Sequence, residues 1–90
     1  MEKLRYPSVA EVIAIHERVM RGLGETPRPL RDEGLLESAL HRPLMAAYYE
    51  GADLIRQATL LGTGISQAQA FLDGNKRTAA VVSETFLALN

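Results

Sequence analysis

The sequence contains no cysteine, which excludes a disulfide framework, a thiolate nucleophile and a cysteine-based zinc site. It also has only two histidines, His16 and His41, which are too few to form a histidine metal cluster. We therefore expect no structural metal.

An excess of one charge is also missing. Ten basic and eleven acidic residues give a formal net charge of -1. The overall charge therefore does not draw the protein toward nucleic acid or an acidic membrane. We expect no direct nucleic-acid binding, and any anion site must be a local cluster.

Long apolar runs are absent as well. No stretch approaches the roughly 18 apolar residues that a membrane-spanning helix needs. The first residues, MEKLRYPS, lack the apolar region of a secretory signal. We therefore expect no membrane contact and a cytoplasmic location.

What is present indicates an ordinary globular protein. The 90 residues are 47% hydrophobic and 23% charged, which suits one folded domain over residues 1–90. There is no internal repeat, and no segment shows the strict alternation of a half-buried strand. The predicted fold class is all-α.

The first half of the chain predicts three helices of different lengths. Ser8 and Glu11 form a capping-box pattern, so a helix should run from about Val9 to Leu23. Prolines in the segment ETPRPL then prevent a helix. Asp32 is placed to cap a short helix that Pro43 ends, and PLMAAYYEGAD reads as a further short helix leading into a loop.

Two longer helices are predicted in the second half. Apolar residues from Asp53 to about Ala68 fall on one helical stripe. The final run, NKRTAAVVSETFLALN, is apolar on most of its circumference and should therefore lie centrally among the others. Together these patterns predict a compact bundle of about five helices around a central C-terminal helix.

The segment FLDGNKR joins these two helices and carries the most informative chemistry. It leads into a helix N-terminus, where backbone N–H groups are unpaired and the helix dipole favours an anion. Gly74 allows close approach of a ligand, Lys76 and Arg77 add positive charge, and Asp73 supplies an oxygen ligand suited to Mg²⁺. The same residues also fit a purely structural interpretation, with Asp73 as an N-cap and the two cations solvated.

With Gln69 at its start, this segment reads QAFLDGNKR and resembles the signature of the Fic/Doc family. That signature is a histidine, any residue, phenylalanine, any residue, Asp or Glu, Gly or Ala, asparagine, Lys or Gly, and arginine. Every position matches except the first. The similarity continues through IAIHERVM, GLLESALHRP and the helix at 53–68, which look like the Doc branch. The resemblance implies the family's compact helical fold, and it implies that the family's C-terminal helices are missing from this chain.

The resemblance implies transfer of a phosphate-containing group from ATP, or another nucleotide, to a protein hydroxyl, either as AMP or as a phosphoryl group. Asp73 would hold Mg²⁺, and Gly74 and Asn75 would form the anion cradle. Lys76 and Arg77 would contact the phosphates. Phenylalanine at the third motif position, Phe71 here, would pack inward and fix the loop.

Gln69 occupies the position of the family's catalytic histidine. A glutamine amide has no useful basicity, so loss of the general base should slow transfer by about 10²- to 10⁴-fold. His16 lies on the apolar stripe of the first helix and is expected to be a hydrogen-bonded core residue, while His41 should interact with the last carbonyls of a short helix. Neither replaces the missing base.

Two tyrosines, Tyr48 and Tyr49, and Glu50 fall in the region that the resemblance assigns to a flap aligning the target segment. On general grounds the tyrosines instead half-bury their rings and leave the hydroxyls in water. They are not included in the predicted site.

Three interpretations remain. The first is a toxin-type domain that binds nucleotide but is inactive or impaired as a transferase. The second is a protein-binding module, in which an antitoxin peptide, another protein or a second copy covers the apolar C-terminal helix. The third is a fragment or degenerate copy of a longer family member. The sequence does not identify the target protein.

Overall fold

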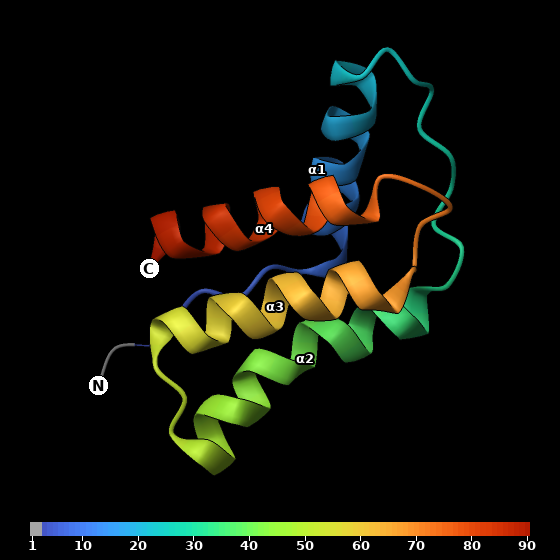
Figure 1. Cartoon of the computed structure of the whole chain (residues 1–90). Coiled ribbons are helices and arrows are strands. Elements are labelled where there is room, and N and C mark those ends of the chain that lie inside the picture. Colours follow the sequence, from blue (N-terminus) through green and yellow to red (C-terminus); the bar gives the residue numbers. More distant parts are fainter. Residues whose placement is uncertain (1–2) are drawn as a thin grey trace.

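The computed structural model describes residues 3–90 and contains four α-helices (Figure 1). They are α1 (Val9–Gly22), α2 (Glu33–Glu50), α3 (Leu54–Ala68) and α4 (Asn75–Leu89). No strand occurs in this part of the chain. The all-α prediction is confirmed, but the predicted number of helices was too high.

Capping residues set the starts of α1, α2 and α3, and the sequence predicts two of these caps, Ser8 and Asp32. The Ser8 hydroxyl accepts a hydrogen bond from the Glu11 N–H at 3.1 Å, and the Glu11 carboxylate accepts one from the Ser8 N–H at 3.2 Å. At α2, Asp32 Oδ1 accepts a hydrogen bond from the Leu35 N–H at 3.1 Å, which confirms the predicted cap. At α3, Asp53 Oδ1 accepts one from the Arg56 N–H at 2.8 Å, a cap that we did not predict. Each bond satisfies an N–H group that has no partner within its helix.

The two short helices expected on either side of Pro43 are one continuous helix, α2. Pro43 lies inside this helix and is fully buried. A proline removes one helical hydrogen bond, but burying its ring recovers part of that cost. The helix ends instead at Gly51, which takes a left-handed conformation with φ of 64°.

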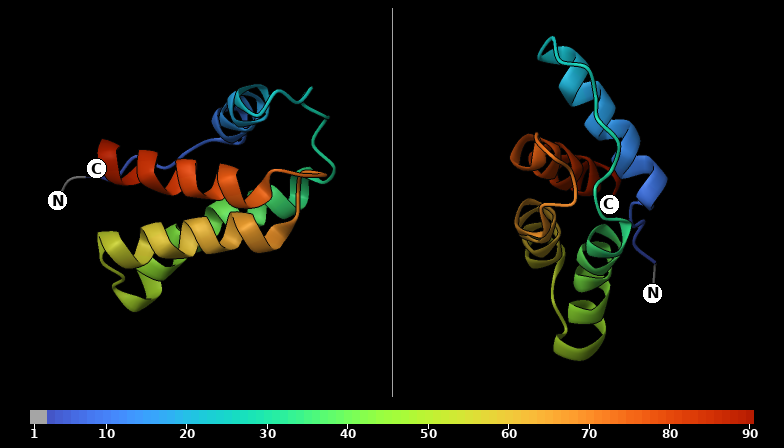
Figure 2. Two further views of the ribbon diagram at one scale, coloured as in Figure 1. Left: turned by 45° about the horizontal axis from the view of Figure 1, so that its top comes forward. Right: turned by 90° about the vertical axis from the view of Figure 1, so that its right-hand side faces the viewer.

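The helices do not surround one common axis, and each packs mainly on one or two of the others. Figure 2 shows α4 lying between α1 and α3, and α2 packs on α3 and touches α1. The backbone of α4 does not come close to that of α2, whereas α3 lies against both, so α4 is not the central helix that we predicted. Its apolar residues Val81, Leu87 and Leu89 are 37%, 37% and 50% exposed, so α4 is not covered on all sides by the other described helices.

All four helices contribute side chains to the core. Its fully buried members include Val12, Leu36, Leu61, Val82 and Phe86. None of the helices described over residues 3–90 is long and apolar enough to cross a membrane.

Candidate functional site

The loop between α3 and α4 turns the chain through two residues in the left-handed backbone region. Gln69 ends α3 with φ 53° and ψ 38°, and Gly74 precedes α4 with φ 73° and ψ 12°. Gln69 is the one non-glycine residue among residues 3–90 with a positive φ. Because side chains disfavour this region, other contacts must hold the loop in place.

The Gln69 side chain is engaged in the loop. Its Nε2 donates a hydrogen bond to the Ser66 carbonyl at 2.9 Å, and its Oε1 accepts one from Asn75 Nδ2 at 3.5 Å. The amide therefore caps the end of α3 and contacts the start of α4. It offers a hydrogen-bonding group at the motif's first position but no proton acceptor of useful basicity.

Asn75 braces the loop from the α4 side. Its side chain is nearly buried, at 6% exposure. Its Oδ1 accepts a hydrogen bond from the Phe71 N–H at 3.1 Å, and its Nδ2 donates to the Phe71 carbonyl at 2.9 Å. Both polar atoms of this side chain are thus hydrogen-bonded within the protein. If Asn75 contacts an anion, only its backbone N–H is available to do so.

His16, a buried residue of α1, contacts the inner side of the loop. It is 1% exposed, its Nε2 lies 3.0 Å from the Asp73 carbonyl oxygen, and its ring stacks on Phe71 with centroids 3.8 Å apart. A carbonyl only accepts hydrogen bonds, so Nε2 carries the proton and donates it. The geometry agrees with the prediction of a hydrogen-bonded core histidine, and Phe71 packs inward as expected, at 2% exposure.

Arg31, in the connector before α2, holds the loop from a third direction. Its Nε donates to the Gln69 carbonyl at 3.0 Å, and the backbone N–H groups of Arg31 and Asp32 donate to the Ala70 carbonyl at 2.7 and 3.2 Å. We did not predict this contact from the sequence, because one arginine in a proline-containing connector forms part of no periodic pattern.

The N-terminus of α4 is open. No side chain caps it within the described residues, and its first backbone hydrogen bond runs from the Thr78 N–H to the Gly74 carbonyl at 3.0 Å. A Cβ atom at Gly74 would lie 2.6 Å from Met20 Sδ, so only glycine fits there without movement. Such a helix start favours an anion through its free N–H groups and its dipole.

The two cationic side chains of the motif, Lys76 and Arg77, are both exposed, but they line different grooves. Lys76 lines a groove between α3 and α4, whereas Arg77 lines a groove between α1 and α4. Neighbouring residues on a helix are about 100° apart, which explains the divergence. The two side chains therefore leave the start of α4 in different directions.

Asp73 presents an exposed carboxylate at the end of the same loop. No group of three or more His, Cys, Asp or Glu residues that could hold a metal occurs in residues 3–90. A magnesium ion that bridges nucleotide phosphates often takes only one or two protein carboxylates, with phosphate and water as its other ligands. A single aspartate beside an uncapped helix start is compatible with that arrangement.

The residues that we associated with a flap lie away from the loop between α3 and α4. Tyr48 and Tyr49 are in the last turn of α2, at the far end of the bundle from the loop 69–74 (Figure 1). They are 80% and 71% exposed and pack edge to face, so the prediction of half-buried rings was wrong. His41 lies inside α2 rather than at a helix end, because that helix continues past Pro43.

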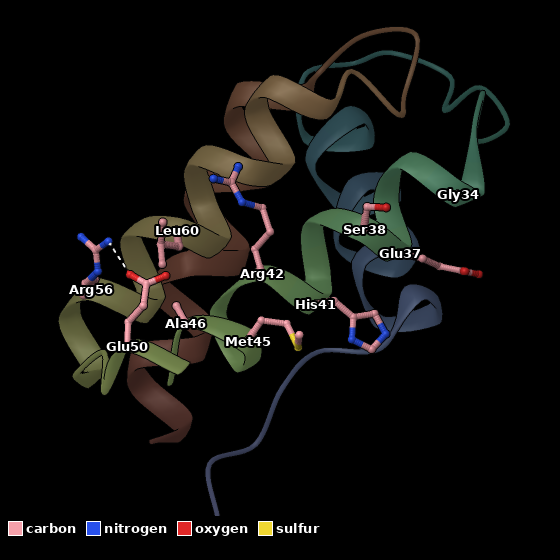
Figure 3. A pocket seen from close by; sticks show the side chains of 10 residues that line it. All are labelled: Gly34, Glu37, Ser38, His41, Arg42, Met45, Ala46, Glu50, Arg56 and Leu60. Atoms are coloured by element: carbon pink, nitrogen blue, oxygen red, sulfur yellow. Dashed lines mark hydrogen bonds and ion pairs between the residues drawn. The ribbon is translucent and has the colours of Figure 1, made fainter. Parts of the chain in front are cut away.

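A separate groove of about 540 Å³ lies between α2 and α3 (Figure 3). It includes none of residues 69–77. Acidic Glu37 and Glu50 and basic Arg42 and Arg56 all line it, and Arg56 forms an ion pair with Glu50 at 3.2 Å. This mixture of charges selects no single class of ligand.

Comparisons with known proteins agree on one family. Residues 6–87 match the Fic/DOC family. A curated relative, "Toxin Doc" of Mycolicibacterium smegmatis, is 40% identical over 65 residues, which cover 68% of this chain and 48% of the relative. The chain therefore spans about half the length of this relative. No solved structure matches the chain at a significant level.

Proposed function

The chain belongs to the Fic/DOC family, on its Doc-like branch, and we propose that it binds the phosphates of a nucleotide at residues 73–77. The open start of α4 carries this proposal. It combines backbone N–H groups that no side chain caps with two exposed cations, Lys76 and Arg77. Both features lie at the family signature.

The proposed ligand is ATP, or another nucleotide, with Mg²⁺, in the cytoplasm. Asp73 would hold the metal, which would neutralise phosphate charge. The backbone N–H groups of Gly74 and Asn75 would cradle a phosphate group, and Lys76 and Arg77 would approach it from different directions. The related reaction moves a phosphoryl or AMP group to a hydroxyl of a protein target. A new bond forms between the hydroxyl oxygen and phosphorus while the bond to the leaving phosphate oxygen breaks.

That reaction also releases the hydroxyl proton, which must go to a base. Gln69 cannot take it, and His16 Nε2 already carries a proton that it donates to the Asp73 carbonyl. We therefore propose that the protein binds nucleotide but transfers the group slowly or not at all.

Calorimetric titration with ATP and Mg²⁺ tests binding. Arg77→Ala should weaken binding by about tenfold or more, because it removes a charge-assisted contact to phosphate. Arg42→Ala is the matched control, since it removes an exposed arginine on α2, away from the loop. Equal binding by the parent protein and both variants would refute the site assignment.

Replacing Gln69 with histidine tests the catalytic part. If a missing base is the defect, Gln69→His should raise transfer of labelled phosphate or AMP to a target, or to the protein itself, by about 10²- to 10⁴-fold. No gain with a suitable target, in a variant that still binds ATP, would show that more than the base is lacking.

A second function, binding of a partner segment, is favoured by a groove between α1 and α4. Its volume is about 350 Å³, Val19, Leu23 and Val81 contribute apolar surface, and Arg18 and Arg77 flank it with no acidic residue in the lining. An acidic, amphipathic segment of an antitoxin would complement it. In light scattering and dye binding, a monomer with no exposed apolar surface would contradict this proposal, whereas a larger mass would identify a homo-oligomer.

A further inference from the structure

We propose that His16 is a positioning residue that orients the backbone of the anion site. This inference rests on the proposed nucleotide binding. His16 does not face the open start of α4, since it is 1% exposed and lies under the loop. Its one polar contact to the loop is the hydrogen bond from Nε2 to the Asp73 carbonyl oxygen at 3.0 Å.

The direction of that bond determines where the next N–H group points. The Asp73 carbonyl and the Gly74 N–H belong to the same peptide unit. In a trans peptide the C=O and N–H bonds point in opposite directions, and residues 3–90 contain no cis peptide bond. Because His16 draws the Asp73 carbonyl inward, the Gly74 N–H is turned away from His16.

The Gly74 N–H lies immediately before the free N–H groups of the first turn of α4. A peptide turned this way adds one more donor to the cradle for a phosphate group. Without the His16 bond, the peptide between Asp73 and Gly74 loses the contact that sets its orientation. Glycine is the residue whose backbone resists such a rotation least.

Packing alone would not set this orientation. Stacking on Phe71, with the two rings 10° from parallel, fixes the plane of the imidazole ring. Only the Nε2–H group recognises a polar atom of the loop, and it does so in a buried place where a hydrogen bond is strong. The stack and the hydrogen bond are therefore separable by mutation.

Two substitutions separate them. His16→Phe retains an aromatic ring of similar size against Phe71 but removes the donor. His16→Gln removes the ring but retains a nitrogen donor as many bonds from Cβ as Nε2. Both proteins are to be compared with the parent chain in amide-proton NMR spectra of the free protein and in titrations with ATP and Mg²⁺.

We expect His16→Phe to move the amide resonance of Gly74, to speed its hydrogen exchange and to weaken ATP binding by about tenfold, the effect of one lost hydrogen bond. His16→Gln should restore binding to within about threefold of the parent. Amides in the middle of α2 should exchange at the parent rate in both variants, which separates a local change from general unfolding.

Parent-like ATP binding and an unchanged Gly74 resonance in His16→Phe would overturn the inference. So would a loss of binding in His16→Phe that His16→Gln does not restore, because the ring rather than the donor would then be needed. If Arg77→Ala also leaves ATP binding intact, the proposed function fails, and the Gly74 resonance of the free protein still decides the role of His16.

Discussion

At the scale of single residues, Gln69 fits the conformation of the loop but lacks the basic group that the family has at this position. Its left-handed backbone is a conformation that histidine also enters more readily than most side chains. Its side-chain amide donates a hydrogen bond to the Ser66 carbonyl and accepts one from Asn75. Gln69→His loses these two side-chain bonds, but the bonds from Arg31 and Asn75 to the loop backbone remain. We therefore expect the variant to keep the loop conformation, so that the exchange changes proton transfer and not the architecture.

Gly74 should be the least replaceable residue of the loop. Its φ is 73°, and an added Cβ would meet Met20 Sδ at 2.6 Å. We expect Gly74→Ala to lower the free energy of unfolding by about 1–2 kcal/mol or more. Gly22→Ala is the control, because a Cβ there meets nothing within 4 Å. It should be neutral or stabilising in urea denaturation, and a similar loss in both variants would contradict this account.

Thr78 carries a polar group that the fold leaves unsatisfied. It is 0% exposed, and its Oγ1 is the one buried side-chain oxygen or nitrogen in residues 3–90 without a hydrogen-bond partner. Thr78→Val has the same shape without the hydroxyl, so it should raise the free energy of unfolding by about 1 kcal/mol. Thr59→Val, which loses a bond to the Ile55 carbonyl, should show no gain. A clear loss of stability in Thr78→Val would indicate a partner for the hydroxyl.

At the scale of helices, the sequence predicted those elements whose ends depend on local contacts. α1 and α2 begin at the predicted capping residues Ser8 and Asp32, which act within three positions along the chain. Pro43 misled the prediction because its effect depends on tertiary burial, which no local pattern contains. The central position expected for α4 failed for the same reason, since apolar content does not say which faces will be covered.

The site was predictable only in part. The motif gave the residues of the α3–α4 loop and the helix start, because they are consecutive in sequence. The contacts of His16 and Arg31 with that loop cross 57 and 38 residues of sequence. Helical periodicity gave the burial of His16, but neither its partner nor the role of Arg31 follows from spacing.

The cap of α3 offers a test at this scale. Asp53→Ala should lower the free energy of unfolding by about 1 kcal/mol, because the Arg56 N–H loses its acceptor at 2.8 Å. Asp53→Asn keeps an acceptor oxygen and should lose little. Thermal or urea unfolding of the two variants provides the measurement, and equal losses would show that charge rather than capping is responsible.

At the scale of the whole molecule, Tyr6 connects the N-terminal segment to two helices. Its hydroxyl donates to Gln57 Oε1 at 2.5 Å, and its ring lies 5.5 Å from that of Phe86, centroid to centroid. Burial raises the pKa of Tyr6 above its ordinary value, so the folded state holds this proton more tightly than the unfolded state.

The contribution of the protonated Tyr6 hydroxyl to the free energy of unfolding is therefore fully present below about pH 10. It is lost as the pH rises through the pKa of Tyr6 in the folded state. Tyr6→Phe cannot ionise, so it should be less stable than the parent near neutral pH because of the lost hydrogen bond. Its unfolding free energy should fall less steeply above about pH 10. Parallel pH profiles for the two proteins would contradict this assignment.

The packing of α1 has a consequence for the order of folding. α2, α3 and α4 pack on the helix next to them in sequence, whereas α1 packs mainly on α4, across the whole intervening chain. Because distant contacts cost more loop-closure entropy, α1 should dock last and detach first. Amides of α1 should then exchange with solvent faster than those of α3, and equal protection would contradict this order. Since α1 carries His16, an intermediate of three helices would contain every motif residue and still lack the hydrogen bond from His16 to the Asp73 carbonyl.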